Sequence, residues 1–243
     1  MNFPPVHDSL TTPNPSALRS EQPDDLLPDL ILNVVRQNRN IVRVKNERLA
    51  VRNLRTILEA TISLSIEMGF AVMSVRDLSR KTGFSMGALY SYFREKDQLL
   101  DMIRQIIADL CARYLEPDPD PAMTPDEKLE HVVRTHLLLT TILRPWFYVL
   151  YMEVRHLTED EKQKTLDATM RAEMRILRCI EEGITTGVFR SDCDPQLTSA
   201  AIKAMLQDWY VKQGLYRTRQ VSIQDYGSFI MDMVRGWMRQ PLH

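Results

Sequence analysis

The chain has 243 residues, of which 44% are hydrophobic and 26% charged, and its formal net charge is −1. A chain of this length and apolar content can bury a core of about two domains. It has no run of about 18 or more apolar residues and no charged-then-apolar leader pattern, which excludes a membrane span and argues against export. Its three cysteines are far apart and fit no zinc spacing, so we expect reduced thiols in a cytoplasmic protein without metal or cofactor.

The charge is distributed unevenly along the chain. Residues 31–104 carry 13 Lys and Arg against 7 Asp and Glu, a balance of +6, so the remaining residues carry −7. A basic part followed by an acidic part is typical of a nucleic-acid-binding domain joined to a domain that stays off the nucleic acid. A charge bias alone usually marks a solvated face, so this interpretation depends on the motifs.

The N-terminus precedes any clear motif. Residues 1–28 are rich in Pro, Ser, Thr and Asp and show little periodicity, which predicts a disordered tail. Residues 29–49 interleave apolar side chains with cations and have two open interpretations. They are either a basic arm that reaches DNA, for example in the minor groove, or an extra element packed on the core with a solvated basic face. The cations of the possible arm are Arg36, Arg39, Arg43, Lys45 and Arg48.

Residues 50–95 are predicted to form three short helices. The first covers about 50–68, and the next two begin at serine caps and are separated by a glycine turn. Two short helices around such a turn outline a helix-turn-helix, whose second helix lies in the DNA major groove. The residues that delimit and orient these helices are Gly69, Ser74 with Asp77, Gly83, Ser85, Leu89 and Phe93.

The end of this unit carries a specific spacing. It reads Leu-Tyr-x-x-Phe-x-x-Lys-x-x-Leu-Leu over residues 89–100. This spacing resembles the TetR family of bacterial transcription regulators, and the resemblance covers about residues 52–104. Thr61 and Ser65 in the first helix depart from the alanine and the aromatic residue that are usual in the family.

The resemblance implies a fold and a function. It implies an all-α homodimer with an N-terminal three-helix helix-turn-helix DNA-binding domain, followed by a helical effector-binding and dimerisation domain over residues 96–243. Residues 96–114 would form the helix that links the two. Most members of the family are repressors that a small molecule releases from a double-stranded DNA operator.

Three residues match family positions that contact phosphates: Tyr90, Tyr92 and Lys96. Their hydroxyl and ammonium groups suit phosphate oxygens. The exposed part of the second helix offers no side chain that can make a bidentate pair with a purine, so we expect base recognition to depend on DNA shape, methyl contacts and cations elsewhere. The other expected DNA-contacting residues are Arg76, Ser85, Met86, Gly87, Ala88 and Ser91.

The second half of the chain is predicted to be helical throughout. Thr124 and Thr158 begin capping boxes, Pro145 and Pro195 open two more helices, and Ser222 precedes the last one. In TetR-like proteins the last two helices meet a second copy as a four-helix bundle, whereas the alternative for their apolar stripes is intramolecular core. The expected dimer residues are Ala201, Met205, Trp209, Phe229, Met233 and Trp237.

The most aromatic segment, residues 144–156, lies where TetR-like proteins often line a ligand pocket, although such a stripe is more often ordinary core. Residues 158–190 are diffusely similar to family members that sense fatty acyl-CoA, which indicates a small hydrophobic effector, with acyl-CoA as one candidate. The candidate ligand residues are Trp146, Phe147, Tyr151, Met152 and Arg155.

Two other functions stay open. Glu153 and His156 have the Glu-x-x-His spacing of di-metal helical bundles, but such a site needs a second pair and two more glutamates, and only His131 and His136 are at hand. The second is a DNA-binding protein without an effector, or an architectural one. The long C-terminal half argues against it, since a bare dimerisation unit can be smaller. We therefore expect a regulator and not an enzyme.

Overall fold

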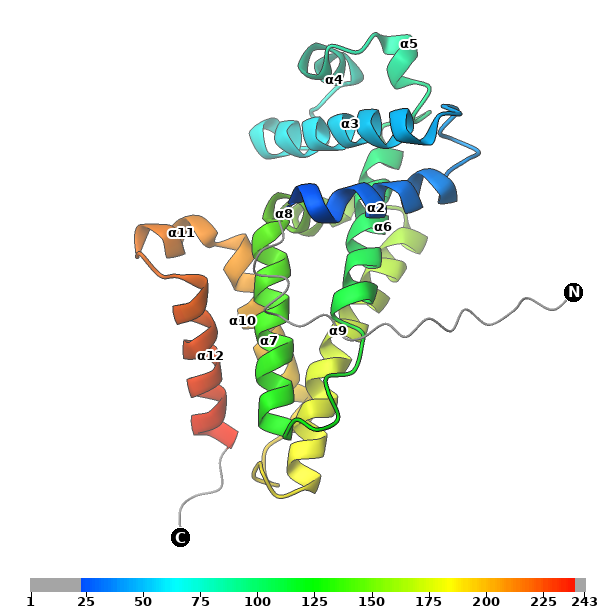
Figure 1. Ribbon diagram of the computed structural model, residues 1–243. Coiled ribbons are helices and arrows are strands. Elements are labelled where there is room, and N and C mark those ends of the chain that lie inside the picture. Colours follow the sequence, from blue (N-terminus) through cyan, green and yellow to red (C-terminus); the bar gives the residue numbers. More distant parts are fainter. Residues whose placement is uncertain (1–22, 239–243) are drawn as a thin grey trace, which may run out of the picture.

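The computed structural model describes residues 23–238, and these residues form helices and no strand (Figure 1). Three helices, α3 to α5, make a head at one end, and α6 to α12 make a larger body. The predicted all-α class is confirmed. The helices are α2 Pro23–Gln37, α3 Glu47–Met68, α4 Val75–Thr82, α5 Met86–Leu89, α6 Asp97–Tyr114, α7 Pro125–Ile142, α8 Arg144–Glu153, the 3-10 turn η1 Val154–His156, α9 Glu159–Thr185, α10 Pro195–Val211, α11 Gln213–Thr218 and α12 Ile223–Met238.

The head is built from local signals in the sequence. The capping box between Ser74 and Asp77 is present at the start of α4, and the Ser85 side chain caps α5. Gly83 has a φ of +74°, a left-handed conformation that ends α4 and turns the chain toward α5. The predicted helix-turn-helix is therefore confirmed, although its preceding helix begins at Glu47 and not near residue 50.

Thr61 and Ser65, the two departures from the family pattern, are buried in α3. Each hydroxyl donates a hydrogen bond of 2.8 Å to the carbonyl four residues earlier in the same helix. Because both buried polar groups are satisfied within α3, the head keeps a closed core despite the departures.

α2 changes the expected organisation of the N-terminus. The predicted tail is wrong for residues 23–28, which form the first turns of α2, while residues 1–22 lie outside the described part. Pro28 lies inside this helix and cannot donate to the carbonyl of residue 24, yet the helix continues through it to Gln37. The helix buries a continuous apolar face against α3 and α6, formed by Leu26, Leu27, Leu30, Ile31, Val34 and Val35. For residues 29–37 the structure therefore agrees with the second interpretation, an extra element packed on the core.

The body is a bundle in which α9 packs against both α7 and α10, and α12 lies along α7 on the outer side (Figure 1). The capping boxes at Thr124 and Thr158 begin α7 and α9 as predicted. Asp194 caps α10 by accepting from the N–H groups of Gln196 and Leu197. Each start is therefore fixed by a side chain within three residues of it.

One hydrophobic core runs through both the head and the upper body. It joins buried side chains of α2, α3, α4 and α6 with those of α8 and reaches Tyr210 at the end of α10. A second core lies within α7, α9, α10 and α12. Because the first core crosses the expected domain boundary near residue 96, a change in the body can be transmitted to the head through packed side chains.

Within residues 23–238 no single helix has the length and apolar character needed to cross a membrane. One bent pair, Pro125–Ile142 with Arg144–His156, passes that test by length and composition when its two helices are joined, and they meet at 89°.

Candidate nucleic-acid interface and effector cavity

The outer surface of the helix-turn-helix presents the residues expected to meet DNA. Ser85, Gly87, Ala88 and Tyr90 are exposed, and Met86 is half-buried. Beneath them the side chain of Leu89 is fully buried, and the Ser79 hydroxyl donates to the Phe84 carbonyl at 2.6 Å across the turn. The exposed surface of the helix-turn-helix is therefore a narrow ridge of mostly small side chains, and it lies on a packed base.

The two tyrosines of the motif have different environments. Tyr90 is 44% exposed, whereas Tyr92 is 3% exposed. The Tyr92 hydroxyl interacts with the Asn53 side chain of α3, and burial raises the pKa of Tyr92. The expectation that Tyr92 contacts phosphate is therefore wrong for this structure, because its ring belongs to the core of the head.

Lys96 does not project toward solvent as a phosphate-binding side chain would. Its ammonium donates three hydrogen bonds, of 2.8, 3.1 and 3.0 Å, to the carbonyls of Phe70, Ala71 and Met73. It also lies 4.7 Å from the centre of the Phe70 ring. All three N–H groups are used, so Lys96 is a clasp on the turn between α3 and α4 in this structure, and the predicted phosphate contact would require it to leave these carbonyls.

The basic segment after α2 lies against the end of the helix-turn-helix. The Arg43 N–H donates to the Ser91 carbonyl at 2.8 Å, and the Arg94 guanidinium donates to the Asn40 carbonyl at 2.9 Å. Backbone bonds of this kind fix the segment's position beside α5. The expected arm is thus attached to the head over its second half.

The five cations of the expected arm divide into two groups. Arg36 and Arg39 both pair with Glu47 at the start of α3. The single carboxylate of Glu47 thus neutralises one of these two exposed charges and holds both side chains at the start of α3. Arg43, Lys45 and Arg48 are exposed, and the structure shows no ion pair for them among the described residues; the same holds for Arg76 of α4.

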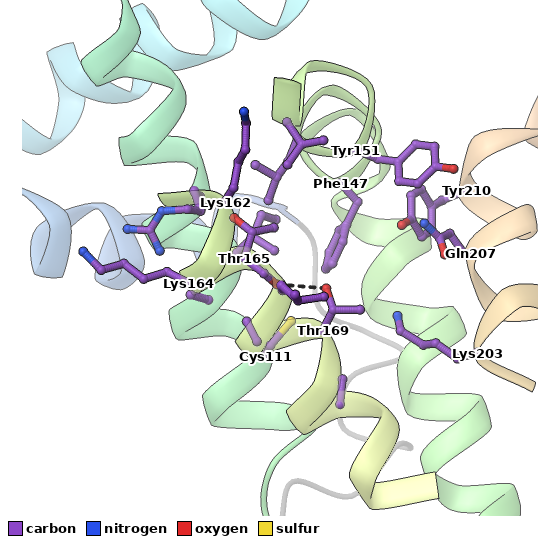
Figure 2. A pocket seen from close by; sticks show the side chains of 18 of the residues that line it. Cys111, Phe147, Tyr151, Lys162, Lys164, Thr165, Thr169, Lys203, Gln207 and Tyr210 are labelled. Atoms are coloured by element: carbon purple, nitrogen blue, oxygen red, sulfur yellow. Dashed lines mark hydrogen bonds between the residues drawn. The ribbon is translucent and has the colours of Figure 1, made fainter. Parts of the chain in front are cut away.

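The body contains a partly open cavity of about 310 Å³ lined by α6, α7, α8, α9 and α10 (Figure 2). Most of its wall is apolar, which is the usual character of a small-molecule site. The side chains that line it include Ile107, Ala108, Cys111, Phe147, Leu150, Tyr151, Val154, Ala168, Ala172 and Tyr210, with Arg104, Lys162 and Lys164 among the charged ones.

Two of the five predicted ligand residues, Phe147 and Tyr151, line this cavity. The other three do not: Trp146 is buried in the core, Met152 is exposed elsewhere, and Arg155 extends beside His156. A helix presents only one stripe to a cavity, so a contiguous aromatic run cannot all face it. The sequence analysis missed the walls supplied by α6, α9 and α10, because no local pattern shows which faces of distant helices meet.

Two polar side chains of this wall, His136 of α7 and Lys203 of α10, lie next to each other. The Lys203 Nζ lies 3.4 Å from the His136 Nε2. Burial, and next the nearby Lys203 charge, hold the pKa of His136 well below its usual range, and burial lowers the pKa of Lys203. Burial also raises the pKa of the Cys111 thiol to about 11, so this wall cysteine is an unreactive thiol near neutral pH.

Phe70, in the turn between α3 and α4, joins the head to the body. Its N–H donates to Glu153 Oε1 at 3.2 Å, and its carbonyl accepts from Lys96. Glu153 ends α8 and Lys96 precedes α6. Both of these helices wall the cavity, so both backbone groups of one residue in the head, the N–H and the carbonyl of Phe70, are tied to helices of the wall.

Glu153 and His156 also form the pair considered above as a metal site, with 3.4 Å between Glu153 Oε2 and His156 Nε2. Among the described residues there is no group of three or more His, Cys, Asp or Glu side chains that could hold a metal ion. The carboxylate instead serves the Phe70 contact.

The outer faces of α10 and α12 carry exposed apolar side chains. Phe229, Met233 and Trp237 on α12 are 58%, 49% and 59% exposed, and Ala201 on α10 is exposed with Met205 half-buried beside it. Trp209 is different: it stacks on Tyr226 at 5.0 Å and donates to the Thr141 hydroxyl at 2.8 Å. Trp209 is therefore intramolecular core, and its predicted place in a dimer interface is wrong.

We expect Lys96→Met to lower the free energy of unfolding by about 2–4 kcal/mol, because three carbonyls lose a charged donor. Urea unfolding of the full chain measures this change. Lys45→Met is the control, since Lys45 is exposed and the structure shows no partner for it among the described residues. An unchanged unfolding midpoint for Lys96→Met would contradict the clasp.

The chain is similar to known proteins over most of its length. Residues 57–103 match the family model for bacterial regulatory proteins of the tetR family, and residues 122–234 match that for the tetracyclin repressor-like C-terminal domain. The HTH-type transcriptional repressor KstR2 of Rhodococcus jostii (strain RHA1) is 27% identical over 182 residues, which cover 72% of this chain and 88% of that protein.

Solved structures share the fold. A bacterial regulatory protein in the tetR family from Rhodococcus RHA1 superposes with a TM-score of 0.67 at 20% identity, covering 75% of this chain and 96% of that one. The transcriptional regulator FadR from Bacillus subtilis, in complex with stearoyl-CoA, gives 0.59 at 18% identity, covering 78% and 99%. With the helix-turn-helix head and the helical body in place, these matches show that the chain belongs to the TetR family of bacterial transcription regulators.

Proposed function

We propose that the protein is a homodimeric, sequence-specific repressor that leaves its operator when a fatty-acyl thioester fills the cavity of the body. The observation that carries this proposal is the direct attachment of the cavity wall to the head, through Phe70. A ligand that changes the position of α6 or α8 changes the position of the helix-turn-helix. An effector can act in this way only if it binds more tightly when the head is in its DNA-releasing position than when it is in its DNA-binding position.

The proposed DNA surface combines the exposed ridge of the helix-turn-helix with the basic segment beside it. Tyr90 offers a hydroxyl donor, and Arg43, Lys45, Arg48 and Arg76 offer charge. Ser85, Met86, Gly87, Ala88 and Ser91 form the part that would lie over the bases. None of these five side chains makes a bidentate contact with a purine, so the proposed specificity depends on methyl contacts and DNA shape.

The effector class is supported by two features of the cavity wall, its apolar interior and its lysines on α9. The apolar interior suits an acyl group, and Lys162 and Lys164 on α9 place charge where phosphates of a coenzyme could bind. The similar fold of FadR is solved with stearoyl-CoA, which supports the same class. The proposed effector is therefore an acyl-CoA, bound with its acyl group inside.

The proposed dimer uses the outer faces of α10 and α12, where Ala201, Met205, Phe229, Met233 and Trp237 gather. Large exposed apolar patches of this kind mark interaction surfaces. A two-fold dimer would place two heads on one side of the molecule, as a palindromic operator requires.

We expect Arg43→Ala to reduce the slope of log affinity against log salt by about 1, because one phosphate contact and its released counterion are lost. Fluorescence anisotropy with operator DNA at several salt concentrations measures the slope. Arg178→Ala is the control, because Arg178 is an exposed cation on α9 in the body. Equal slopes for wild type and Arg43→Ala would remove Arg43 from the DNA surface.

Met233→Asp is expected to give a monomer that binds operator weakly, since a carboxylate would be buried without a partner in the interface. Analytical ultracentrifugation gives the oligomeric state. The matched control is Met170→Asp on α9, because Met170 is 48% exposed and Met233 is 49% exposed. A Met233→Asp protein that stays dimeric would place the interface elsewhere.

The effector proposal is tested by adding acyl-CoAs, from butyryl- to stearoyl-CoA, to the protein bound to operator DNA. We expect release of the DNA by at least one of them, and loss of that release in Ala168→Phe, whose new ring occupies the cavity. Ala112→Phe, at an exposed position of α6 outside the cavity, should respond as wild type does. Operator binding that ignores every thioester would favour a DNA-binding protein without an effector of this class.

A further inference from the structure

Lys203 is a cation in the wall of the cavity with no anionic partner. It projects from α10 toward the cavity, on the side opposite Lys164 (Figure 2). Its ammonium forms no ion pair with any described residue, and its one polar contact is His136 Nε2 at 3.4 Å. Glu173 attracts this charge only from beyond ion-pair distance. The other cations of the wall, Arg104, Lys162 and Lys164, each pair with a carboxylate of their own helix.

An unpaired ammonium is costly in an apolar wall. Removing the ammonium group from water costs free energy, and only a hydrogen-bonded group of opposite charge offsets that cost. His136 does not offset it, because the low pKa of this buried imidazole leaves it neutral. Two of the three N–H groups of Lys203 therefore have no partner among residues 23–238, and the side chain borders the cavity.

We propose that the effector's acyl group carries an oxygen acceptor, best a carboxylate, at the end remote from the thioester, and that Lys203 binds it. This inference rests on the proposed acyl-thioester effector and narrows its class. A carboxylate beside Lys203 forms a charge-assisted hydrogen bond shielded from water, and Gln207 on the same helix lies in the same wall.

A plain acyl chain fits this end of the cavity poorly. Its terminal methylenes would lie against the ammonium and displace water without replacing its hydrogen bonds. Sites built around a buried polar group discriminate strongly against ligands that lack the matching group. The thioester carbonyl is a second possible acceptor, and a comparison of two thioesters that differ only at the remote end of the acyl group separates it from a terminal carboxylate.

The test compares two CoA thioesters of equal chain length: octanoyl-CoA and the mono-CoA thioester of octanedioic acid. Isothermal titration calorimetry on the full-length protein gives both dissociation constants. We expect the carboxylated thioester to bind at least about tenfold more tightly, which corresponds to about 1.4 kcal/mol. In Lys203→Met that preference should be lost or reversed, while Lys203→Arg should retain most of it.

Lys164→Met is the matched control, because it removes a cation from the opposite side of the cavity. It should weaken both thioesters by the same factor and leave their ratio unchanged. Thermal unfolding of each variant shows whether it has folded. Equal binding of the two thioesters by wild type, or a preference that persists in Lys203→Met, would overturn the inference and leave the acyl-CoA effector standing. Binding of neither thioester would overturn the inference, and absence of DNA release by every acyl-CoA from butyryl- to stearoyl-CoA would overturn the proposed effector as well.

Discussion

The two backbone hydrogen bonds at Phe70 are the constraint on which the coupling of this molecule depends. The Phe70 N–H is held by Glu153 from the end of α8, and its carbonyl by Lys96 from the start of α6. Backbone groups in turns need partners, and here the body supplies them. The head therefore cannot tilt without breaking or carrying along contacts to the two helices that wall the cavity.

α2 strengthens the same coupling from the other side of the head. Asn38, just after this helix, donates to Gln105 of α6 at 2.8 Å, and Gln105 donates to Asp101 at 2.6 Å. Asp101 in turn accepts from Arg104, a residue of the cavity wall, at 2.7 Å. A continuous set of side-chain contacts thus runs from the cavity to the basic segment beside α5.

The sequence predicts those features that local chemistry decides. Serine and threonine caps, the left-handed glycine at position 83 and the apolar stripes each depend on residues within one or two turns, so the head and the helix starts could be read directly. Tyr92, Lys96 and Trp209 could not, because their partners lie in distant elements: Asn53, the turn after α3, and Tyr226 with Thr141. Lys203 went unrecognised for the same reason, since only the assembled bundle shows that it faces a cavity.

The most direct test of coupling through Phe70 is the factor by which a saturating acyl-CoA that releases the wild type weakens operator binding. We would measure it for wild type, for Glu153→Met, which removes the acceptor for the Phe70 N–H, and for Glu153→Gln, which keeps one. Coupling through this contact predicts a factor near 1 for Glu153→Met, with wild-type-like operator binding in the absence of ligand, and most of the wild-type factor for Glu153→Gln. An undiminished factor in a folded Glu153→Met protein would contradict it.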